Sequence, residues 1–171
     1  MATAHLHRDL DTLIGDFVDP LGYGRYVLII EAFRSSVEAC FQSPERPTAT
    51  PAPLSILDDV RADCRDLGLA ARSSPQPLAL GAEADEWLGA QYVLEGSMLG
   101  ARVLFERAQA FGFTQDFGAR HLAVQSRSIA RWQSFLGCLE GPERFNLEAA
   151  AAGAERVFRV ALEAAESIDV H

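Results

Sequence analysis

Two histidines near the start of the chain are the first residues whose chemistry stands out. His5 and His7 are each followed four residues later by an aspartate, Asp9 and Asp11 respectively. On a helix this spacing places the two members of each pair on the same face. Imidazole is a common metal ligand, and a bound imidazole usually donates its second ring N–H to an acceptor such as a carboxylate. Either histidine could therefore hold a metal, although both could equally be surface side chains on a first helical turn.

A second group of residues stands out because it has almost no side chains. Gly96 and Gly100 lie four residues apart in an otherwise helical stretch, with Ser97 and Ala101 beside them. A glycine inside a helix costs about 1 kcal/mol relative to alanine, so two of them need a reason. The strip that they form would let the helix bend and let another object approach its backbone. Tight helix crossing is the alternative explanation, because small residues four apart also permit that contact.

The charged residues limit the kinds of partner that the chain can have. The formal net charge is −9, which argues against general nucleic-acid binding because phosphates need a concentrated positive surface. All 15 basic residues are arginine, so any carboxylate ligand would be held by guanidinium groups. The three cysteines form no CxxC pair and predict neither a disulfide framework nor a zinc site.

Helices must position these residues, because apolar side chains recur at spacings of three and four along most of the chain. Pro20 and Gly22, a proline-rich segment at 43–53, and Gly141–Pro142 interrupt this pattern. We predict six helices, over residues 2–16, 23–41, 55–69, 84–111, 117–139 and 143–167. The fourth should bend at its glycines, and Gly153 should weaken the last. The fold class expected for residues 1–171 is a single all-α domain, an orthogonal multihelical bundle.

The chain carries no signal for a membrane or for export. It contains no run of 18 apolar residues, and its N-terminus lacks the apolar segment of a secretory signal. We therefore expect a cytoplasmic protein with no membrane partner.

The glycine strip belongs to a longer motif that indicates a family. Residues 92–101 read Tyr-Val-Leu-Glu-Gly-Ser-Met-Leu-Gly-Ala, which resembles the distal-helix motif of bacterial haem oxygenases. In that family the glycines let the helix bend over one face of haem and leave room for iron-bound dioxygen. The resemblance implies that Gly96, Ser97 and Gly100 form the catalytic, distal side of a haem site.

The N-terminal segment resembles the same family. Haem oxygenases open with Thr-x-x-x-His-x-x-φ-Asp/Glu, in which φ is small or apolar, the histidine is the proximal iron ligand and the acid assists it. Thr3, His7, Leu10 and Asp11 fit this register, whereas His5 does not. The resemblance therefore selects His7 as the ligand of the haem iron. Further stretches resemble the family in the expected order, at residues 23–26, 57–68, 131–136 and 154–158.

Haem has two propionates, which need cations or hydroxyls at the edge of the pocket. The resemblance implies four candidates, Arg8, Tyr92, Arg127 and Arg131. Arg127 and Arg131 are four residues apart on the fifth predicted helix and could therefore act together. For each arginine a solvated surface position is the alternative.

Ser97 marks a departure from the animal members of the family. Those proteins carry an aspartate directly after the first distal glycine, where it organises a water network that protonates bound peroxide. Serine, which many bacterial relatives have here, can hold a water but supplies no charge. The resemblance therefore implies a proton relay through ordered water or another group.

The resemblance implies an enzyme that cleaves haem to biliverdin, carbon monoxide and ferrous iron. The reaction uses dioxygen and an external electron donor, which would be a ferredoxin, a flavodoxin or a flavoprotein reductase. Two other functions remain open: a carrier or sensor that binds haem without cleaving it, and a haem-free helical module that binds a protein. The sequence assigns neither the cleaved meso carbon nor the oligomeric state.

Overall fold

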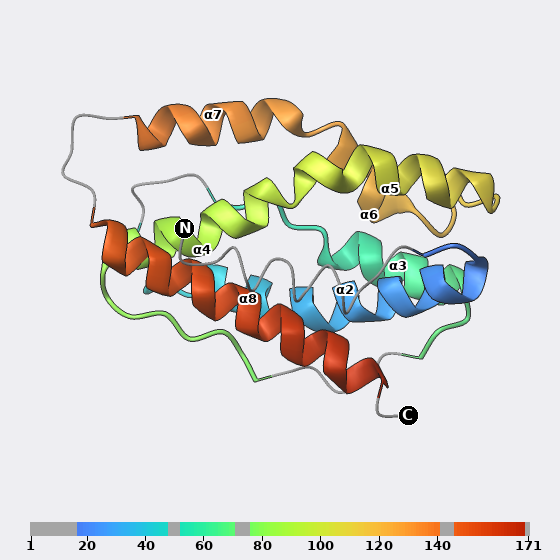
Figure 1. Ribbon diagram of the computed structural model, residues 1–171, viewed down its shortest axis with the longest axis horizontal. Helices are drawn as coiled ribbons and strands as arrows, with labels where there is room; N and C mark the ends of the chain where they lie inside the picture. The colour runs from blue at the N-terminus through green and yellow to red at the C-terminus, as the bar shows by residue number, and fades with distance from the viewer. Residues whose placement is uncertain (1–16, 48–51, 71–75, 141–145, 170–171) are drawn as a thin grey trace.

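The computed structural model describes residues 17–47, 52–70, 76–140 and 146–169, and within them the chain is helical. Its α-helices, shown in Figure 1, are α2 (Pro20–Phe41), α3 (Leu57–Asp66), α4 (Ala84–Gly96), α5 (Met98–Ala110), α6 (Arg120–Ser126), α7 (Ile129–Leu139) and α8 (Leu147–Asp169). In the described part of the chain, β-pairing is limited to isolated bridges from Thr114 to Phe117 and Gly118. The predicted all-α fold is confirmed. The helix predicted over 2–16 lies outside the described residues.

Helix α2 begins three residues earlier than predicted. Pro20 and Gly22 were expected to precede the helix, but α2 begins at Pro20. Proline is tolerated in a first helical turn because the N–H that it lacks would have no partner there. Asp19 caps the helix by accepting a hydrogen bond from the Gly22 amide at 2.7 Å. The two residues therefore begin the helix.

Two of the predicted helices are each divided in the structure. Residues 84–111 form α4 and α5, which meet at Ser97, so the bend expected at the glycines is present. Residues 117–139 form α6 and α7, separated at Arg127 and Ser128. Beside that break, Ser126 and Ser128 donate hydrogen bonds to the Ala123 and Val124 carbonyls. Such side-chain bonds compete with the backbone ladder of a helix, and the sequence pattern did not reveal them.

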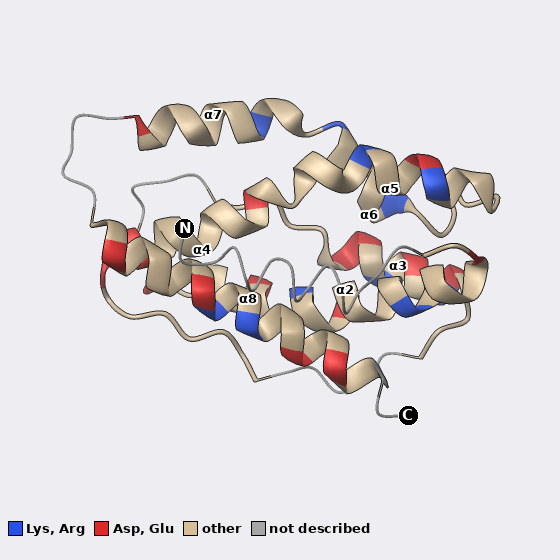
Figure 2. Cartoon of the chain, in the orientation of Figure 1, with Lys and Arg blue, Asp and Glu red and all other residues tan. Residues whose placement is uncertain are grey.

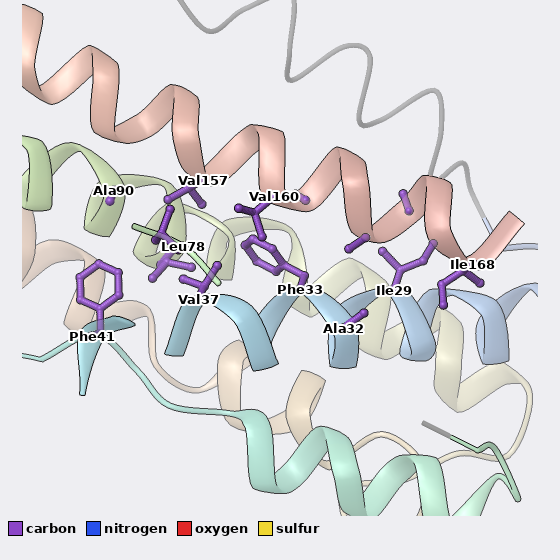
Figure 3. Packing of buried hydrophobic residues seen from close by; sticks show 14 of the residues in the cluster. Ile29, Ala32, Phe33, Val37, Phe41, Leu78, Ala90, Val157, Val160 and Ile168 are labelled. Carbon is purple, nitrogen blue, oxygen red and sulfur yellow. The ribbon is translucent and has the colours of Figure 1, made fainter. Parts of the chain in front are cut away.

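The main core lies where α8 crosses α2 and α4. Figure 3 shows the apolar side chains of α2, including Ile29, Phe33 and Val37, packed against Val157 and Val160 of α8. Helices α4 and α8 cross so closely that a Cβ built on Gly89 or on Gly153 would overlap the backbone of the opposite helix. Gly153 therefore permits a helix contact, and α8 continues through it without a break, contrary to the predicted weak point.

A second apolar cluster joins α2 to α3, α5 and α6, with Tyr23, Val27, Ile56, Val60 and Leu122 among its buried members. Polar contacts between α3 and the start of α6 support it. The buried Asp63 carboxylate lies 2.7 Å from His121 Nδ1 and 3.1 Å from Arg120 Nη1. Leu28 packs against both clusters, so the two are in contact through α2.

Helix α7 lies farther from the rest of the bundle than the other helices (Figure 1). Phe135 is its only buried residue, and Arg131 is its only charged residue. Figure 2 shows the same helix as nearly uncharged, while α8 carries several acidic and basic residues. None of the described helices has the length and apolar character needed to span a membrane.

Candidate functional site

An apolar, solvent-exposed stripe runs along the bent pair α4–α5. Tyr92, Leu99 and Val103 are 48%, 55% and 51% exposed, although most large apolar side chains in the described residues are covered. Tyr92 and Gly96 lie four positions apart on α4, and Leu99 and Val103 lie four positions apart on α5, so each pair shares one face of its helix. The stripe therefore combines exposed apolar side chains with the glycines that the sequence singled out.

The two glycines of the stripe are not sites of tight helix packing. A Cβ built on Gly100 would meet no atom of the described chain within 4 Å, and one on Gly96 would meet only the Trp132 ring, at 3.7 Å. At the α4–α8 crossing, by contrast, added Cβ atoms would overlap backbone. Helix crossing, the alternative explanation for the glycine strip, thus applies to Gly89 and Gly153 and not to Gly100.

Ser97 holds the bend between α4 and α5. Its hydroxyl donates to the Leu94 carbonyl at 2.6 Å and accepts hydrogen bonds from Arg34 and Gln125, both at 3.3 Å. A serine hydroxyl has one donor and two acceptor positions, so these three bonds use its full capacity. In this arrangement Ser97 connects three helices at the bend, and its oxygen has no position left for a water.

Arg34 is the buried cation beneath the bend. The Arg34 side chain is 3% exposed and lies 3.7 Å from the Glu38 carboxylate one turn along α2. Burial lowers the pKa of Arg34, and the neighbouring Glu38 opposes that shift. Sequence reasoning missed both residues, although an arginine and a glutamate four apart in an apolar helix would have been a usable signal.

Glu38 extends this cluster to the segment before α3. Its carboxylate accepts hydrogen bonds from the Ser55 hydroxyl at 2.6 Å and from the Ile56 amide at 2.9 Å. The helix that the sequence predicts from residue 55 is α3, which begins at Leu57 without a side-chain cap. The bend in α4–α5 is thus connected through α2 to the 52–56 segment.

The structure places the two predicted arginine partners of a propionate on different elements. Arg127 follows α6, and its guanidinium contacts the Gln115 side chain. Arg131 lies on α7, where it pairs with Glu95 at 3.1 Å and donates to the Ala52 carbonyl at 2.7 Å. The single helix that would let them act together is broken between them, because α6 ends at Ser126.

Tyr92 is the remaining described candidate for a propionate contact. Its ring packs edge-on against Trp132 of α7, with the ring centroids 5.1 Å apart. About half of the residue is exposed, so Tyr92 remains accessible from solvent. The predicted iron ligand His7, its partner Asp11 and the nearby Arg8 lie outside the described residues, as does His5.

The pair formed by His121 and Asp63 is a second buried polar group that the sequence did not suggest. Both side chains are fully buried, and the His121 ring stacks on Tyr26 with centroids 6.0 Å apart. Burial raises the pKa of Tyr26 well above its ordinary value. Nevertheless, no group of three or more His, Cys, Asp or Glu in the described residues is arranged to hold a metal ion.

Comparisons with known proteins agree on one group of relatives. No family model matches the chain. It is 33% identical to heme oxygenase PigA of Pseudomonas aeruginosa over 170 residues, which cover 92% of this chain and 84% of that protein. Its fold is similar to that of the heme oxygenase from Neisseria meningitidis, which was solved with NO and CO bound. The TM-score is 0.71 at 25% identity, and the match covers 98% of this chain and 87% of the other.

Proposed function

This chain belongs to the haem oxygenase family of enzymes, and on that premise we propose that it binds haem and cleaves the porphyrin to biliverdin, carbon monoxide and ferrous iron. The observation that carries the proposal is the exposed stripe on α4–α5, whose sequence was the first sign of the family. An apolar porphyrin face needs a flat wall with few side chains, because projecting groups would prevent contact with the ring. Tyr92, Leu99 and Val103 supply apolar surface, and no side chain projects from this surface at Gly96 and Gly100.

We assign the opposite wall of the site to the N-terminal segment. There His7 would bind the haem iron from the proximal side, and Asp11 would accept the second ring N–H of that imidazole and fix its orientation. When bound, haem is the substrate and also supplies the iron that activates dioxygen. An external donor, a ferredoxin, a flavodoxin or a flavoprotein reductase, would provide the electrons.

The residues of the distal wall shape the space next to the porphyrin and exclude water from it. With haem bound, Gly96 and Gly100 would leave space beside the porphyrin, and Leu99 and Val103 would limit the water that reaches it. Ser97 contributes by holding the bend that sets this space. The surface at Gly100 is open enough to accept a haem face, because a Cβ added there would meet no described atom.

Charge favours Arg127 over Arg131 as a propionate partner. The Arg131 guanidinium already faces the Glu95 carboxylate, which neutralises it. Arg127 is exposed and contacts a neutral amide, so its charge remains available to an anion. We assign Tyr92 and Arg8 to the same edge, where a hydroxyl and a second guanidinium would complete the contacts.

Reconstitution with haem followed by reduction in air tests this function. The purified chain should shift the haem absorption band, and the reduced complex should then lose that band and yield biliverdin, identified by absorption and mass. Release of intact haem after reduction would favour the carrier or sensor, and absence of any band shift would favour the haem-free module. Cytoplasmic location remains a prediction from the sequence.

A further inference from the structure

A pocket of about 270 Å³ lies between α4 and α7, beside the bend. The residues that line it are Gln91, Glu95, Ala130, Arg131, Ser134 and Phe135. Ala130 and Ser134 are exposed, whereas Gln91, Glu95 and Phe135 are buried. The pocket therefore leads from solvent on the α7 side to a buried glutamate on α4.

Two buried polar atoms in this pocket have no hydrogen-bond partner. They are Oε2 of Glu95, whose side chain is 1% exposed, and Nε of Arg131. The other Glu95 oxygen accepts from Arg131 Nη2 at 3.1 Å, so the ion pair presents one spare acceptor and one spare donor. Buried polar atoms are nearly always satisfied, and water is the common ligand that can serve both kinds at once. The pocket is large enough for several waters.

The buried end of the pocket lies next to the candidate distal wall. Glu95 is bonded directly to Gly96, the first glycine of the stripe. Trp132 comes from the same α7 turn as Arg131 and lies over Gly96, at 3.7 Å from a Cβ built there. The charged groups that face Glu95 are Arg131 from α7 and Arg34 from α2, and Glu95 acts to raise the pKa of Arg34. Ser97 adds no charge to this group.

We propose that Glu95 holds ordered water in the α4–α7 pocket and orients it beside Gly96, so that solvent protons reach the distal wall along this route. This assignment rests on the proposed function and makes Glu95 a positioning residue. Its carboxylate provides the fixed negative charge that the serine at position 97 lacks. Arg131 holds that carboxylate in place through one of its oxygens, and the other oxygen remains free for water.

The first test replaces Glu95 by glutamine, which keeps the shape of the side chain and removes its charge. E95Q should bind haem with an unchanged absorption band and affinity, yet turn over at least about tenfold more slowly. The deficit should widen as pH rises, because the variant depends on bulk protons. E95D should restore part of the rate. E86Q is the matched control, because Glu86 is another buried glutamate of α4 paired with an arginine, Arg156, but does not line the pocket.

A second test closes the mouth of the pocket without touching the ion pair. Ser134 is exposed on α7, so S134L should fold and should slow turnover in the same pH-dependent way, while Q133L at the exposed neighbouring position should not. Wild-type rates and pH profiles in both E95Q and S134L would overturn the proposal. So would a loss of rate in E95Q that is equal at every pH and is not relieved in E95D. Failure of the proposed function would be distinguishable from failure of this proposal about Glu95. If the proposed function is wrong, the wild-type protein itself will yield no biliverdin in the same assay.

Discussion

At the scale of single residues, side chains from distant helices determine the geometry of the bend. The Ser97 hydroxyl is shared by the Leu94 carbonyl, Arg34 and Gln125, and Arg34 is itself paired with Glu38. A buried ion pair contributes little net stability, but removing one member leaves the other charge buried alone. The bend is therefore sensitive to residues that do not contact the candidate haem-binding wall.

Replacing Arg34 by methionine should destabilise the protein by about 3–5 kcal/mol, because Glu38 would lose its buried partner. Urea unfolding followed by circular dichroism measures this difference. R102M is the control, since the side chain of Arg102 is 82% exposed and pairs with the exposed Glu106, and it should change stability by less than about 0.5 kcal/mol. Equal stabilities for R34M and R102M would contradict the role given to Arg34.

Replacing His7 by alanine should abolish normal haem ligation and leave the helical fold intact. The reason is that the resemblance to the family makes this imidazole the iron ligand, while the core lies between α2, α4 and α8. The haem absorption spectrum and the far-ultraviolet circular dichroism report the two effects separately. H5A is the matched control and should keep the wild-type haem spectrum. A normal spectrum in H7A would move the ligand elsewhere, and His5 would be the next residue to test.

At the scale of elements, hydrophobic periodicity predicted the helices well because it records which face is buried. It did not predict the division of 117–139 into α6 and α7, because it carries no information about the hydroxyl bonds that Ser126 and Ser128 make to nearby carbonyls beside that break. Nor could it tell that Gly89 and Gly153 serve a helix crossing while Gly100 faces outward. In the sequence, a glycine at a helix crossing and a glycine on an exposed face look alike. Which of the two it is depends on which helices pack together in the fold.

Replacing Gly100 by leucine should block turnover before it blocks haem binding. No described atom would contact the new Cβ, and leucine favours a helix over glycine by roughly 1 kcal/mol, so the protein should remain folded. The added side chain would fill the space above the ring. Haem titration and biliverdin yield measure the two steps. G137L is the control because Gly137 is an equally open helical glycine on α7. Full turnover in G100L would remove Gly100 from the site.

The contact between α3 and α6 should make stability depend on pH. The hydrogen bond from Arg120 lowers the pKa of Asp66, so the ionised form is favoured in the folded state. Its contribution is present above the pKa of Asp66 in the unfolded chain and is lost as pH falls through the lower folded value. D66N should therefore show a shallower loss of stability on acidification, measured by urea unfolding at several pH values. An unchanged slope would contradict this assignment.

At the scale of the whole molecule, the all-α class and the family could be predicted from the sequence, since both depend on local pattern and on a specific ten-residue motif. The arrangement of the helices could not, because it depends on contacts such as the α4–α8 crossing and the polar cluster around Arg34. Glu95 was likewise missed as a functional residue, because only the structure shows that one of its oxygens has no partner. We propose that the 171 residues act as one domain, with haem bound between the N-terminal segment and α4–α5.

A crystal structure of the haem complex tests this arrangement most directly. We expect one porphyrin with its iron bonded to a ring nitrogen of His7 and its opposite face against Gly96, Leu99, Gly100 and Val103. A porphyrin bound on another surface, or an iron whose protein ligand is a different residue, would contradict it.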